Sequence, residues 1–371
     1  MKFLLTVIGT RPEAIKFMPI LLAIRRNKYF KNKVCITNQH TGLLEQMLLS
    51  LGIQVDYQFK RLENEHTLQQ KAARILEQFG EFLLKIKPDL ILVQGDTVTS
   101  FIAALAAFYT HIPIAHVEAG LRTGRLDSPW PEEGHRRLIA QITSYFFAPT
   151  QKAKKALLKE GVPSNKIWVV GNTSIDAIRL NQESAITIGD SMPQNIVVTI
   201  HRRENLGEPL KEICHALRII ATQFPNVKIT FFLHPNPYVC KTVTKLLSNI
   251  SNIDLLEPLD HFSFIRTLKK CSFIITDSGG IQEEASFIGK PVLITRDTTE
   301  RPEGVIVGAA RLVGIKSANI VTCCCELLKN PEKLADMSKI HYSYGDGYAA
   351  ERIVDILEQE IKRQSLCTQR I

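Results

Sequence analysis

Short, nearly continuous apolar runs alternate with longer amphipathic stretches over the first half of the chain. The apolar runs predict strands at Phe3–Ile8, Val34–Thr37, Leu90–Gln94, Ile112–Val117, Tyr145–Ala148 and Ile167–Val169. Between them, helical periodicity covers Glu13–Arg26, Leu43–Leu51, Leu68–Ile86, Val98–Tyr109, Glu132–Thr143 and Gln151–Glu160. Because parallel strands that are covered on both faces are apolar almost throughout, this alternation predicts a doubly wound α/β sheet.

The same alternation restarts after a polar, weakly patterned stretch, Asn181 to Asn195, which is the expected linker. The later strands are predicted at Ile196–Ile200, Val227–Leu233, Ile253–Leu256, Phe273–Ile275 and Val292–Ile294. The pattern predicts two Rossmann-like doubly wound domains, residues 1–180 and 181–348, facing across a cleft. A last helix at about Ala349–Arg363, within residues 349–371, is expected to pack back on the first domain.

Composition narrows the class of protein. A hydrophobic fraction of 45% and a charged fraction of 22% are typical of a soluble globular chain. The net charge of +9 comes from scattered basic residues without a nucleic-acid-binding motif, so we expect no polymeric nucleic acid as partner. No apolar run is long enough to span a membrane. The eight cysteines contain no C-x-x-C pair and no metal pattern, which favours reduced thiols in the cytoplasm and no metal.

A Ser-Gly-Gly turn follows the predicted strand Phe273–Ile275 and opens a helix. Gly279 and Gly280 allow close approach of a ligand to the backbone, and the free N–H groups of the helix start favour an anion such as a phosphate. Ser278 can cap the helix or donate to that phosphate, and Glu284 can accept from sugar hydroxyls. The alternative is that the three residues form only a turn and an N-cap.

The first predicted strand ends in a loop that leads into a helix and lacks G-x-G-x-x-G. A nicotinamide dinucleotide cofactor is therefore not supported. Arg11 and Lys16 place two cations near the positive end of the helix dipole, where an anion or acidic groups between them would offset the repulsion. The alternative is that both are ordinary surface cations.

Carboxylates follow two of the next predicted strands. Asp96 and Glu118 project from carboxyl ends of strands, where open α/β sheets bind ligands. Glu132 opens a helix after Pro129-Trp130-Pro131, and Arg136 lies four residues on, along the same face. Caps and ion pairs are one interpretation, but three acids expected in one crevice beside Arg11 and Lys16 favour acid–base chemistry.

A basic loop, His201-Arg202-Arg203, follows the first strand of the second predicted sheet. Imidazolium and guanidinium groups both offer charged donors, so His201 and Arg202 form a candidate diphosphate site together with the Ser278–Gly280 turn. His234 occupies an equivalent loop, and its role stays open.

These segments resemble the non-hydrolysing UDP-N-acetylglucosamine 2-epimerases. The matching motifs occur in order over nearly the whole chain, at Gly9–Lys16, Gly95–Thr97, His116–Gly124, Pro129–Glu133, His201–Glu204, Asp277–Glu284 and Arg296–Glu303. The resemblance implies a GT-B fold, a homodimer, and reversible conversion of UDP-N-acetylglucosamine to UDP-N-acetylmannosamine without metal or nicotinamide. In that family UDP leaves anti to a C2 proton, giving 2-acetamidoglucal, and then adds back.

The resemblance also implies roles for individual residues. Asp96, Glu118 and Glu132 match proton-transfer positions, and His201 matches an active-site histidine. The positions that match substrate or nucleotide contacts are Arg11, Lys16, Arg136, Phe264, Ser278, Gly279, Gly280, Glu284 and Arg301. Many bacterial members bind a second UDP-N-acetylglucosamine as activator through Gln-His-Arg, whereas this chain has Gln39-His40-Thr41, so the resemblance does not extend to that arginine.

Three other functions compete with this interpretation. A hydrolysing 2-epimerase would release free N-acetylmannosamine, but Arg11-Pro12-Glu13 matches the non-hydrolysing pattern. A retaining glycosyltransferase would not require three acids in the first domain. A non-catalytic UDP-sugar sensor would bind without turnover, which the intact acids disfavour.

Overall fold

The computed structural model describes residues 1–37, 43–60, 67–181 and 194–368. The chain divides into two compact units, the first formed by Met1–Leu180 with Gly345–Ile371 and the second by Asn181–Tyr344. Most of the expected linker, and the 39–41 segment, lie outside the described residues.

The first unit contains a parallel sheet of seven strands in the order β3-β2-β1-β4-β5-β6-β7. The strands are β1 (Lys2–Ile8), β2 (Phe30–Ile36), β3 (Tyr57–Gln58), β4 (Leu90–Gln94), β5 (Ile114–Val117), β6 (Tyr145–Ala148) and β7 (Ile167–Val169). The order reverses between β1 and β4, which makes this the switch point where ligands bind in open α/β sheets.

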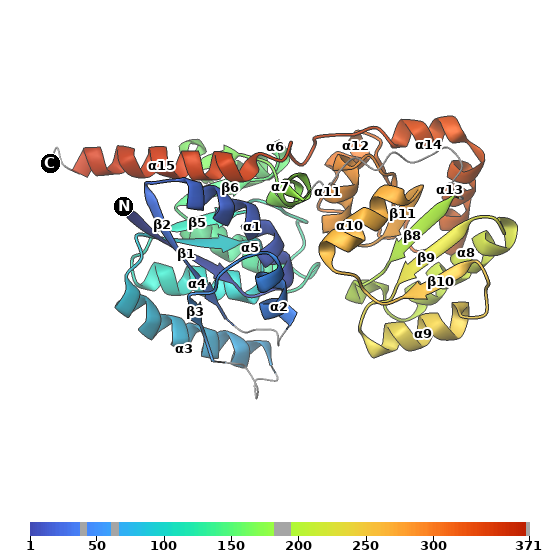
Figure 1. Ribbon diagram of the computed structural model, residues 1–371, viewed down its shortest axis with the longest axis horizontal. Helices are drawn as coiled ribbons and strands as arrows, with labels where there is room; N and C mark the ends of the chain where they lie inside the picture. Colours follow the sequence, from blue (N-terminus) through green and yellow to red (C-terminus); the bar gives the residue numbers. More distant parts are fainter. Residues whose placement is uncertain (38–42, 61–66, 182–193, 369–371) are drawn as a thin grey trace. The chain divides into compact units, whose positions relative to one another are not determined.

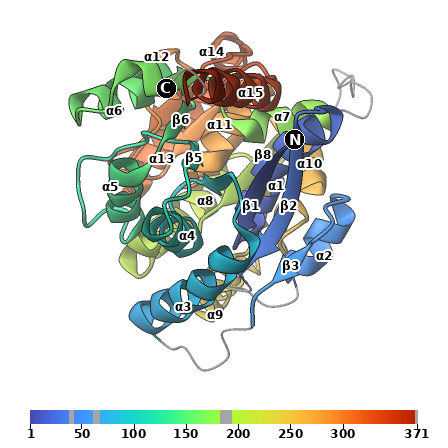
Figure 2. The same ribbon diagram turned by 90° about the vertical axis from the view of Figure 1, so that its left-hand side faces the viewer.

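Helices cover both faces of this sheet (Figures 1 and 2). One group, α3 (Leu68–Ile86), α4 (Val98–Tyr109) and α5 (Glu132–Ile142), packs together, and α1 (Arg11–Arg26) packs with α7 (Thr173–Leu180) and α15 (Ala349–Thr368). The remaining helices are α2 (Leu43–Ser50), α6 (Gln151–Lys159) and the 3₁₀ turn Ser164–Lys166. Coverage on both faces explains why the strands are apolar throughout.

The C-terminal helix belongs to the first unit although the whole second unit precedes it in the chain. Asp176, at the end of the first segment, accepts a hydrogen bond from Ala350 N at 2.7 Å and so caps the start of α15. Further along, Tyr145 Oη donates to Gln364 Oε1 at 2.9 Å. Contacts at both ends of α15 therefore hold it on this unit.

The second unit contains six parallel strands in the order β10-β9-β8-β11-β12-β13. They are β8 (Asn195–Thr199), β9 (Lys228–Phe232), β10 (Ile253–Leu256), β11 (Phe273–Thr276), β12 (Val292–Ile294) and β13 (Ala310–Leu312). The helices are α8 (Glu208–Gln223), α9 (Pro237–Leu247), α10 (His261–Lys270), α11 (Gly279–Phe287), α12 (Glu303–Ile306), α13 (Ser317–Lys329) and α14 (Pro331–Met337), with a 3₁₀ turn at Arg203–Asn205. Numbered from its own first strand, this order repeats that of the first six strands of the first unit.

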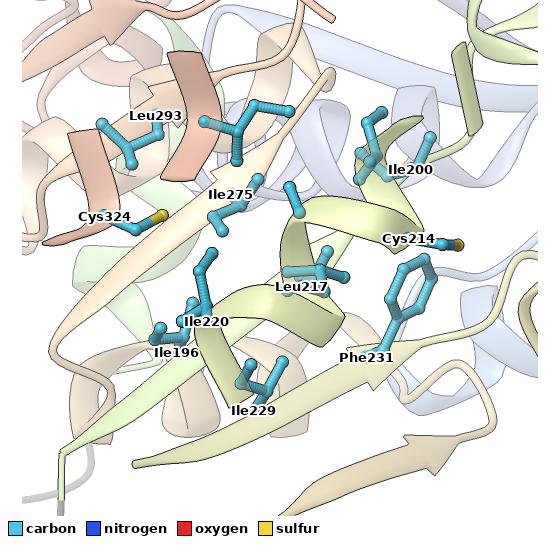
Figure 3. Packing of buried hydrophobic residues seen from close by; sticks show 14 of the residues in the cluster. Ile196, Ile200, Cys214, Leu217, Ile220, Ile229, Phe231, Ile275, Leu293 and Cys324 are labelled. Atoms are coloured by element: carbon cyan, nitrogen blue, oxygen red, sulfur yellow. The ribbon is translucent and has the colours of Figure 1, made fainter. Parts of the chain in front are cut away.

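Apolar side chains from the sheet and from α8 form the main core of the second unit (Figure 3). Ile196, Ile229 and Ile275 from three strands meet Leu217 and Ile220 of α8, and each of these side chains is fully buried. Burial of such side chains contributes on the order of 2 kcal/mol each. The core thus fixes the sheet, and the sheet fixes the loops at its carboxyl edge.

The hydrophobic pattern did not predict three elements, β3, β13 and α7. Strand β3 has only two residues, Tyr57 and Gln58, and β13 places Arg311 between two apolar residues at the edge of its sheet. Helix α7 is eight residues long and buries Thr173, Ser174 and Asp176 on its packed side. Short length and buried polar residues give no clear period, so local sequence does not reveal these elements. Within the described residues, none of the helices is both long enough and apolar enough to span a membrane.

Candidate active site

Two carboxylates lie at the carboxyl ends of neighbouring strands in the first unit. Strands β4 and β5 pair in parallel with Gln94 opposite Val117, so the residues that follow them, Asp96 and Glu118, emerge at the same edge of the sheet. Glu118 adopts a left-handed backbone conformation with φ of 63°, which is uncommon for a residue other than glycine. The adjacency expected from the sequence is therefore present.

Three donors surround the Glu118 carboxylate. Lys16 Nζ lies 2.6 Å from Oε2 and 2.8 Å from Oε1, Gln94 Nε2 donates to Oε2 at 2.5 Å, and Asn172 Nδ2 donates to Oε1 at 3.0 Å. Glu118 is 8% exposed, so its pairing with Lys16 takes place in a poorly hydrated setting. Lys16 comes from α1 and reaches this carboxylate from 102 residues away in the chain.

Asp96 forms an ion pair with Arg136 of α5. Arg136 Nε and Nη2 both lie 2.7 Å from Asp96 Oδ2, a charge-assisted geometry that fixes the carboxylate. His135 Nδ1 contacts the Asp96 backbone oxygen at 2.8 Å. Helix α5 therefore holds both the side chain and the backbone of the Asp96 turn.

Buried His116 supports the same turn from strand β5. Its Nε2 lies 2.7 Å from the carbonyl oxygen of Gly95, whose φ is +66°. Burial lowers the pKa of His116 to about 4, so the ring is neutral at neutral pH and its Nε2–H donates to Gly95. The sequence did not mark His116 as a candidate, since an alternating position inside a strand carries no sign of its contact.

The Asp277 carboxylate and the His201 imidazole lie in contact at the carboxyl edge of the second sheet. Asp277 is fully buried after β11, and its Oδ1 lies 3.0 Å from His201 Nδ1. It also accepts from the backbone N–H groups of His201 and Arg202, and from Asn205 Nδ2 at 2.8 Å. Burial raises the pKa of Asp277, but the hydrogen bonds and charge from His201, with those of Arg202 and Asn205, outweigh it and hold that pKa below its ordinary value.

An arginine cluster converges on buried Glu300 beside this pair. Glu300 Oε1 lies 2.6 Å from Arg301 Nη1 and 3.2 Å from Arg202 Nη2, and Oε2 lies 2.8 Å from Arg296 Nη1. Arg301 also pairs with buried Glu283. The cluster holds three guanidinium groups in fixed positions, which suits an anionic ligand.

Gly279 at the start of α11 touches this cluster. A Cβ placed on Gly279 would lie 2.4 Å from Arg301 Nη1, whereas one on Gly280 would meet nothing within 4 Å. Only a residue without a side chain lets Arg301 lie against the helix N-terminus, where free N–H groups also favour an anion. The two glycines thus differ: Gly279 makes room for arginine, and Gly280 faces open space.

The remaining expected contacts lie on the same unit. The Ser278 side chain makes no helix-capping hydrogen bond, contrary to one of its two expected uses, and its N–H donates to Thr276 Oγ1 at 3.0 Å. Glu284 Oε1 lies 3.8 Å from His261 Nε2 on α10. Phe264, also on α10, packs edge-on against Phe232 with ring centroids 5.3 Å apart.

Comparison with known proteins decides the family. The model of the family described as UDP-N-acetylglucosamine 2-epimerase matches residues 22–358. The UDP-N-acetylglucosamine 2-epimerase of Escherichia coli strain K12 is 43% identical over 367 residues, which cover 95% of this chain and 98% of the relative. This chain belongs to the UDP-N-acetylglucosamine 2-epimerase family. The expected family and its isomerase class are confirmed.

Solved structures confirm the fold of this family member. A crystal structure of UDP-GlcNAc 2-epimerase from Neisseria meningitidis bound to UDP-GlcNAc is 42% identical, covers 96% of this chain and 100% of that one, and has a TM-score of 0.91. A glycotransferase of kitacinnamycin, only 11% identical, shares the fold alone at a TM-score of 0.67. The expected α/β fold of the GT-B type is confirmed.

Helix α5 of this 2-epimerase family member holds Glu132, Glu133 and Arg136 in different settings. Arg136 turns toward Asp96, with Glu133 Oε2 3.4 Å from its Nη1. Glu132 Oε2 is buried without a hydrogen-bond partner among the described residues. Glu133 is 0% exposed and takes the inward position.

Glu133 is a residue that sequence reasoning missed. It accepts from the backbone N–H of Thr123 at 3.0 Å and of Gly124 at 3.3 Å, so it holds the loop that follows β5. The only available signal was its place beside Glu132 in the Pro129–Glu133 motif, and adjacent acids cannot be told apart without a helix orientation.

The first-unit cations behave differently from one another in this epimerase family member. Lys16 is bound to Glu118, whereas the Arg11 side chain is exposed and makes no hydrogen bond or ion pair in the described part of the chain. Of the two cations expected to flank one anion, Lys16 is therefore already paired with a carboxylate, and Arg11 is exposed and able to bind a ligand. Among the described residues no group of three or more His, Cys, Asp or Glu side chains is arranged to hold a metal ion.

Proposed function

We propose that this protein catalyses the reversible epimerisation of UDP-N-acetylglucosamine at C2 to UDP-N-acetylmannosamine, in the non-hydrolysing manner. The observation that carries the proposal is the pair of cation-bound carboxylates, Asp96 with Arg136 and Glu118 with Lys16, at adjoining strand ends. Membership of the family and the UDP-GlcNAc bound by the Neisseria meningitidis relative support this choice of substrate.

The reaction needs a base and an acid but no oxidant. A base takes the proton from C2, and the electrons of the C2–H bond form a double bond between C1 and C2. The C1–O bond breaks at the same time, and its electron pair leaves with UDP to give 2-acetamidoglucal. UDP then adds back at C1 as C2 gains a proton on the opposite face. Asp96, Glu118 and Glu132 supply the proton-transfer groups, and Lys16 and Arg136 keep two of these carboxylates oriented.

Departed UDP must be retained until it adds back. The second unit offers His201, Arg202 and Arg301 to the diphosphate, together with the Ser278 hydroxyl and the N–H groups of Gly279 and Gly280 at the start of α11. Glu284 is assigned to the ribose and Phe264 to the uracil region, and Arg11 to the diphosphate or sugar. Such retention separates an epimerase from a hydrolase.

The test is turnover in deuterated water followed by NMR. Purified protein given UDP-N-acetylglucosamine is expected to form the manno epimer and to place deuterium at C2 of both sugars. Free N-acetylmannosamine would identify a hydrolase instead, and substrate that stays unchanged and unlabelled would contradict the catalytic proposal.

The Asp96→Asn variant tests the acid–base assignment. Exchange at C2 is expected to fall by on the order of 10³-fold, because the proton-transfer group is lost. UDP affinity, measured by calorimetry, is expected to change by less than about threefold, since most diphosphate contacts are assigned to the other unit. A loss of UDP affinity would make Asp96 a structural residue.

The proposed setting is a cytoplasmic homodimer whose product supplies N-acetylmannosamine units for a surface polysaccharide. The resemblance implies the dimer, and free cysteines at the described positions fit a reducing compartment. Light scattering is expected to give twice the chain mass of 41.8 kDa. A monomer at working concentration would exclude the dimer and leave the chemistry in place.

A further inference from the structure

Glu13 is a buried carboxyl group that joins two loops of the first unit. It is 2% exposed, and its Oε2 accepts from Gly9 N at 2.9 Å and from Thr10 N at 2.6 Å. Its Oε1 lies 2.7 Å from Thr97 Oγ1 and 2.8 Å from Ser100 Oγ. One carboxyl group therefore ties the loop after β1, which precedes Arg11, to the loop after β4, which contains Asp96.

The backbone of the first loop also packs against a side chain that follows the second loop. A Cβ on Gly9 would lie 2.0 Å from Thr99 Oγ1, so the loop after β1 packs directly on the start of α4. Thr99 Oγ1 in turn lies 2.8 Å from Thr37 Oγ1 at the end of β2. Because the two loops are closely packed, a change in the hydrogen bonds of Glu13 shifts the loops relative to each other.

The hydroxyl of Ser100 reveals the protonation state of Glu13. Its single proton must serve two contacts, to the Gln94 carbonyl oxygen at 2.6 Å and to Glu13 Oε1 at 2.8 Å. A carbonyl oxygen carries no proton, so an ionised Glu13 would leave one of these short oxygen pairs without any hydrogen. A proton on Glu13 Oε1 satisfies both, because Glu13 then donates to Ser100 and Ser100 donates to Gln94.

The neighbouring hydroxyl fits the same arrangement. Thr97 Oγ1 accepts from Ser100 N at 3.0 Å, and its own proton is free to point at Glu13. Thr10 Oγ1 likewise donates to Oε2 at 2.9 Å. Every polar contact of Glu13 is then made with one donor and one acceptor.

Within the part of the chain that the structure describes, no charged group is bound to Glu13. Of the ionisable side chains on the surrounding elements, Lys16 binds Glu118, Asp96 binds Arg136, His116 contacts Gly95 and Arg11 is exposed. With only neutral partners, burial raises the pKa of Glu13 above its ordinary value. This electrostatic setting agrees with the proton count.

We propose that Glu13 is a positioning residue, held as an uncharged carboxylic acid, that keeps the Arg11 loop and the Asp96 loop in register for the reaction. It does not touch the substrate. Its part in turnover rests on the proposed function, whereas its charge state can be measured without it.

The first experiment measures unfolding in urea from pH 5 to pH 8.5 for wild type and Glu13→Gln. Folded wild type keeps a proton that the unfolded chain releases above its own pKa, so wild type loses stability as pH rises. The ratio of the wild-type unfolding constant to that of the variant is expected to rise tenfold per pH unit until Glu13 ionises in the folded state. A ratio that is flat with pH, or that falls, would show an ionised Glu13 and overturn the proposal.

The second experiment compares the steady-state kinetics of Glu13→Gln and Glu13→Ala. Glutamine offers a donor to Ser100 and an acceptor to Gly9 and Thr10, so kcat is expected within about threefold of wild type. Alanine removes the tie between the two loops, and kcat is expected to fall at least thirtyfold. Rescue by glutamine but not by alanine is a result that lost stability alone does not produce.

Asn252→Ala is the matched control. Asn252 Nδ2 donates to three carbonyl oxygens in the second unit, away from every proposed site residue. Its loss is expected to lower stability without changing kcat. An alanine variant at Glu13 with wild-type kcat, or a glutamine variant as impaired as alanine, would contradict the positioning role.

A failure of the proposed function can be distinguished from a failure of the proposal for Glu13. If wild type does not convert UDP-N-acetylglucosamine, the chemistry is wrong, and affinity for the same compound replaces kcat as the readout. Glu13→Ala is then expected to bind it at least tenfold more weakly and Glu13→Gln within threefold. Equal affinities would overturn the positioning role, and the pH slope still decides the charge.

Discussion

Both units join the same pair of loops through a buried carboxyl group, but the two carboxyl groups differ in charge. Numbered from its own first strand, each sheet contains the order 3-2-1-4-5-6, to which the first sheet adds a seventh strand, and the loops after strands one and four meet where the order reverses. In each unit a buried carboxyl group ties these loops together. Glu13 does so in the first unit and Asp277 in the second.

The hydrogen-bond partners of Glu13 and Asp277 explain why the pKa values of these two carboxyl groups differ. Glu13 meets only backbone N–H groups and hydroxyls, and burial raises its pKa. Asp277 is also buried, but His201 and two backbone N–H groups hold its pKa low. Burial alone therefore does not determine the charge of a carboxyl group, since one adjacent imidazole reverses the outcome. The uncharged tie positions a loop, and the charged tie also orients a functional side chain.

The largest effect on turnover among the variants that test this comparison is expected from Asp277→Asn. His201 Nδ1 loses its anionic partner, so that carboxylate no longer holds the imidazole in place, and kcat is expected to fall by on the order of 10²-fold. UDP affinity is expected to fall less, because Arg301 and the start of α11 are untouched. Steady-state kinetics and calorimetry measure the two effects separately.

Asp346→Asn serves as control for this variant. Asp346 pairs with Arg352, and both side chains are 43% exposed, so its loss is expected to cost less than about 1 kcal/mol of stability and no activity. If Asp277→Asn keeps wild-type kcat, the orientation of His201 does not depend on that carboxylate, and the distinction between the two ties disappears.

The Gly279→Ala variant tests the arginine cluster of the second unit. The added methyl would lie 2.4 Å from Arg301 Nη1 and 2.7 Å from Cζ, and Glu283 and Glu300 restrain that guanidinium. Arg301 must move, and UDP affinity is expected to fall about tenfold, or ~1.4 kcal/mol. Calorimetry gives the affinity directly.

Gly80→Ala is the counterpart in the first unit. Gly80 lies inside α3, and a Cβ there meets nothing within 4 Å, so alanine is expected to stabilise the protein by up to about 1 kcal/mol and to leave UDP binding unchanged. Equal UDP affinity in both glycine variants would mean that Arg301 is not part of the nucleotide site.

The smallest effect on turnover is expected from Asp176→Asn, a third buried carboxyl group. Burial raises the pKa of Asp176 to about 6, although Ala350 N donates to it. The folded protein binds a proton below about pH 6 that the unfolded chain releases near its ordinary pKa. Wild type therefore loses stability as pH rises from about 4 to 6, by at most ~3 kcal/mol relative to the variant.

Urea unfolding at pH 4 and pH 7 measures this difference, and kcat is expected to stay at the wild-type value. A loss of stability with rising pH would show that Asp176, like Glu13, has a pKa above its ordinary value in the folded protein, whereas the pKa of Asp277 is lowered. A stability difference that does not change with pH would show that backbone donors alone keep a buried aspartate ionised.

Much of the fold could be predicted because its signals are local. Strand β4 and helix α4 begin and end where the apolar run and the helical period place them, at Leu90–Gln94 and Val98–Tyr109. Residue type at strand ends was also informative, since Asp96 and Glu118 follow adjacent parallel strands. The inward position of Glu133 beside Arg136 was not predictable, because helical spacing does not say which side of a helix is buried.

The sequence by itself determined the α/β alternation, the placing of acids and glycines at strand ends, and the family. Those properties depend on residue type and short spacing. Only the tertiary structure decided which carboxyl groups are charged. Glu13 meets Ser100, 87 residues on, and Asp277 meets His201, 76 residues back, and no local pattern reports such meetings. A carboxyl group takes its charge from its burial and its partners, and folding alone brings these together.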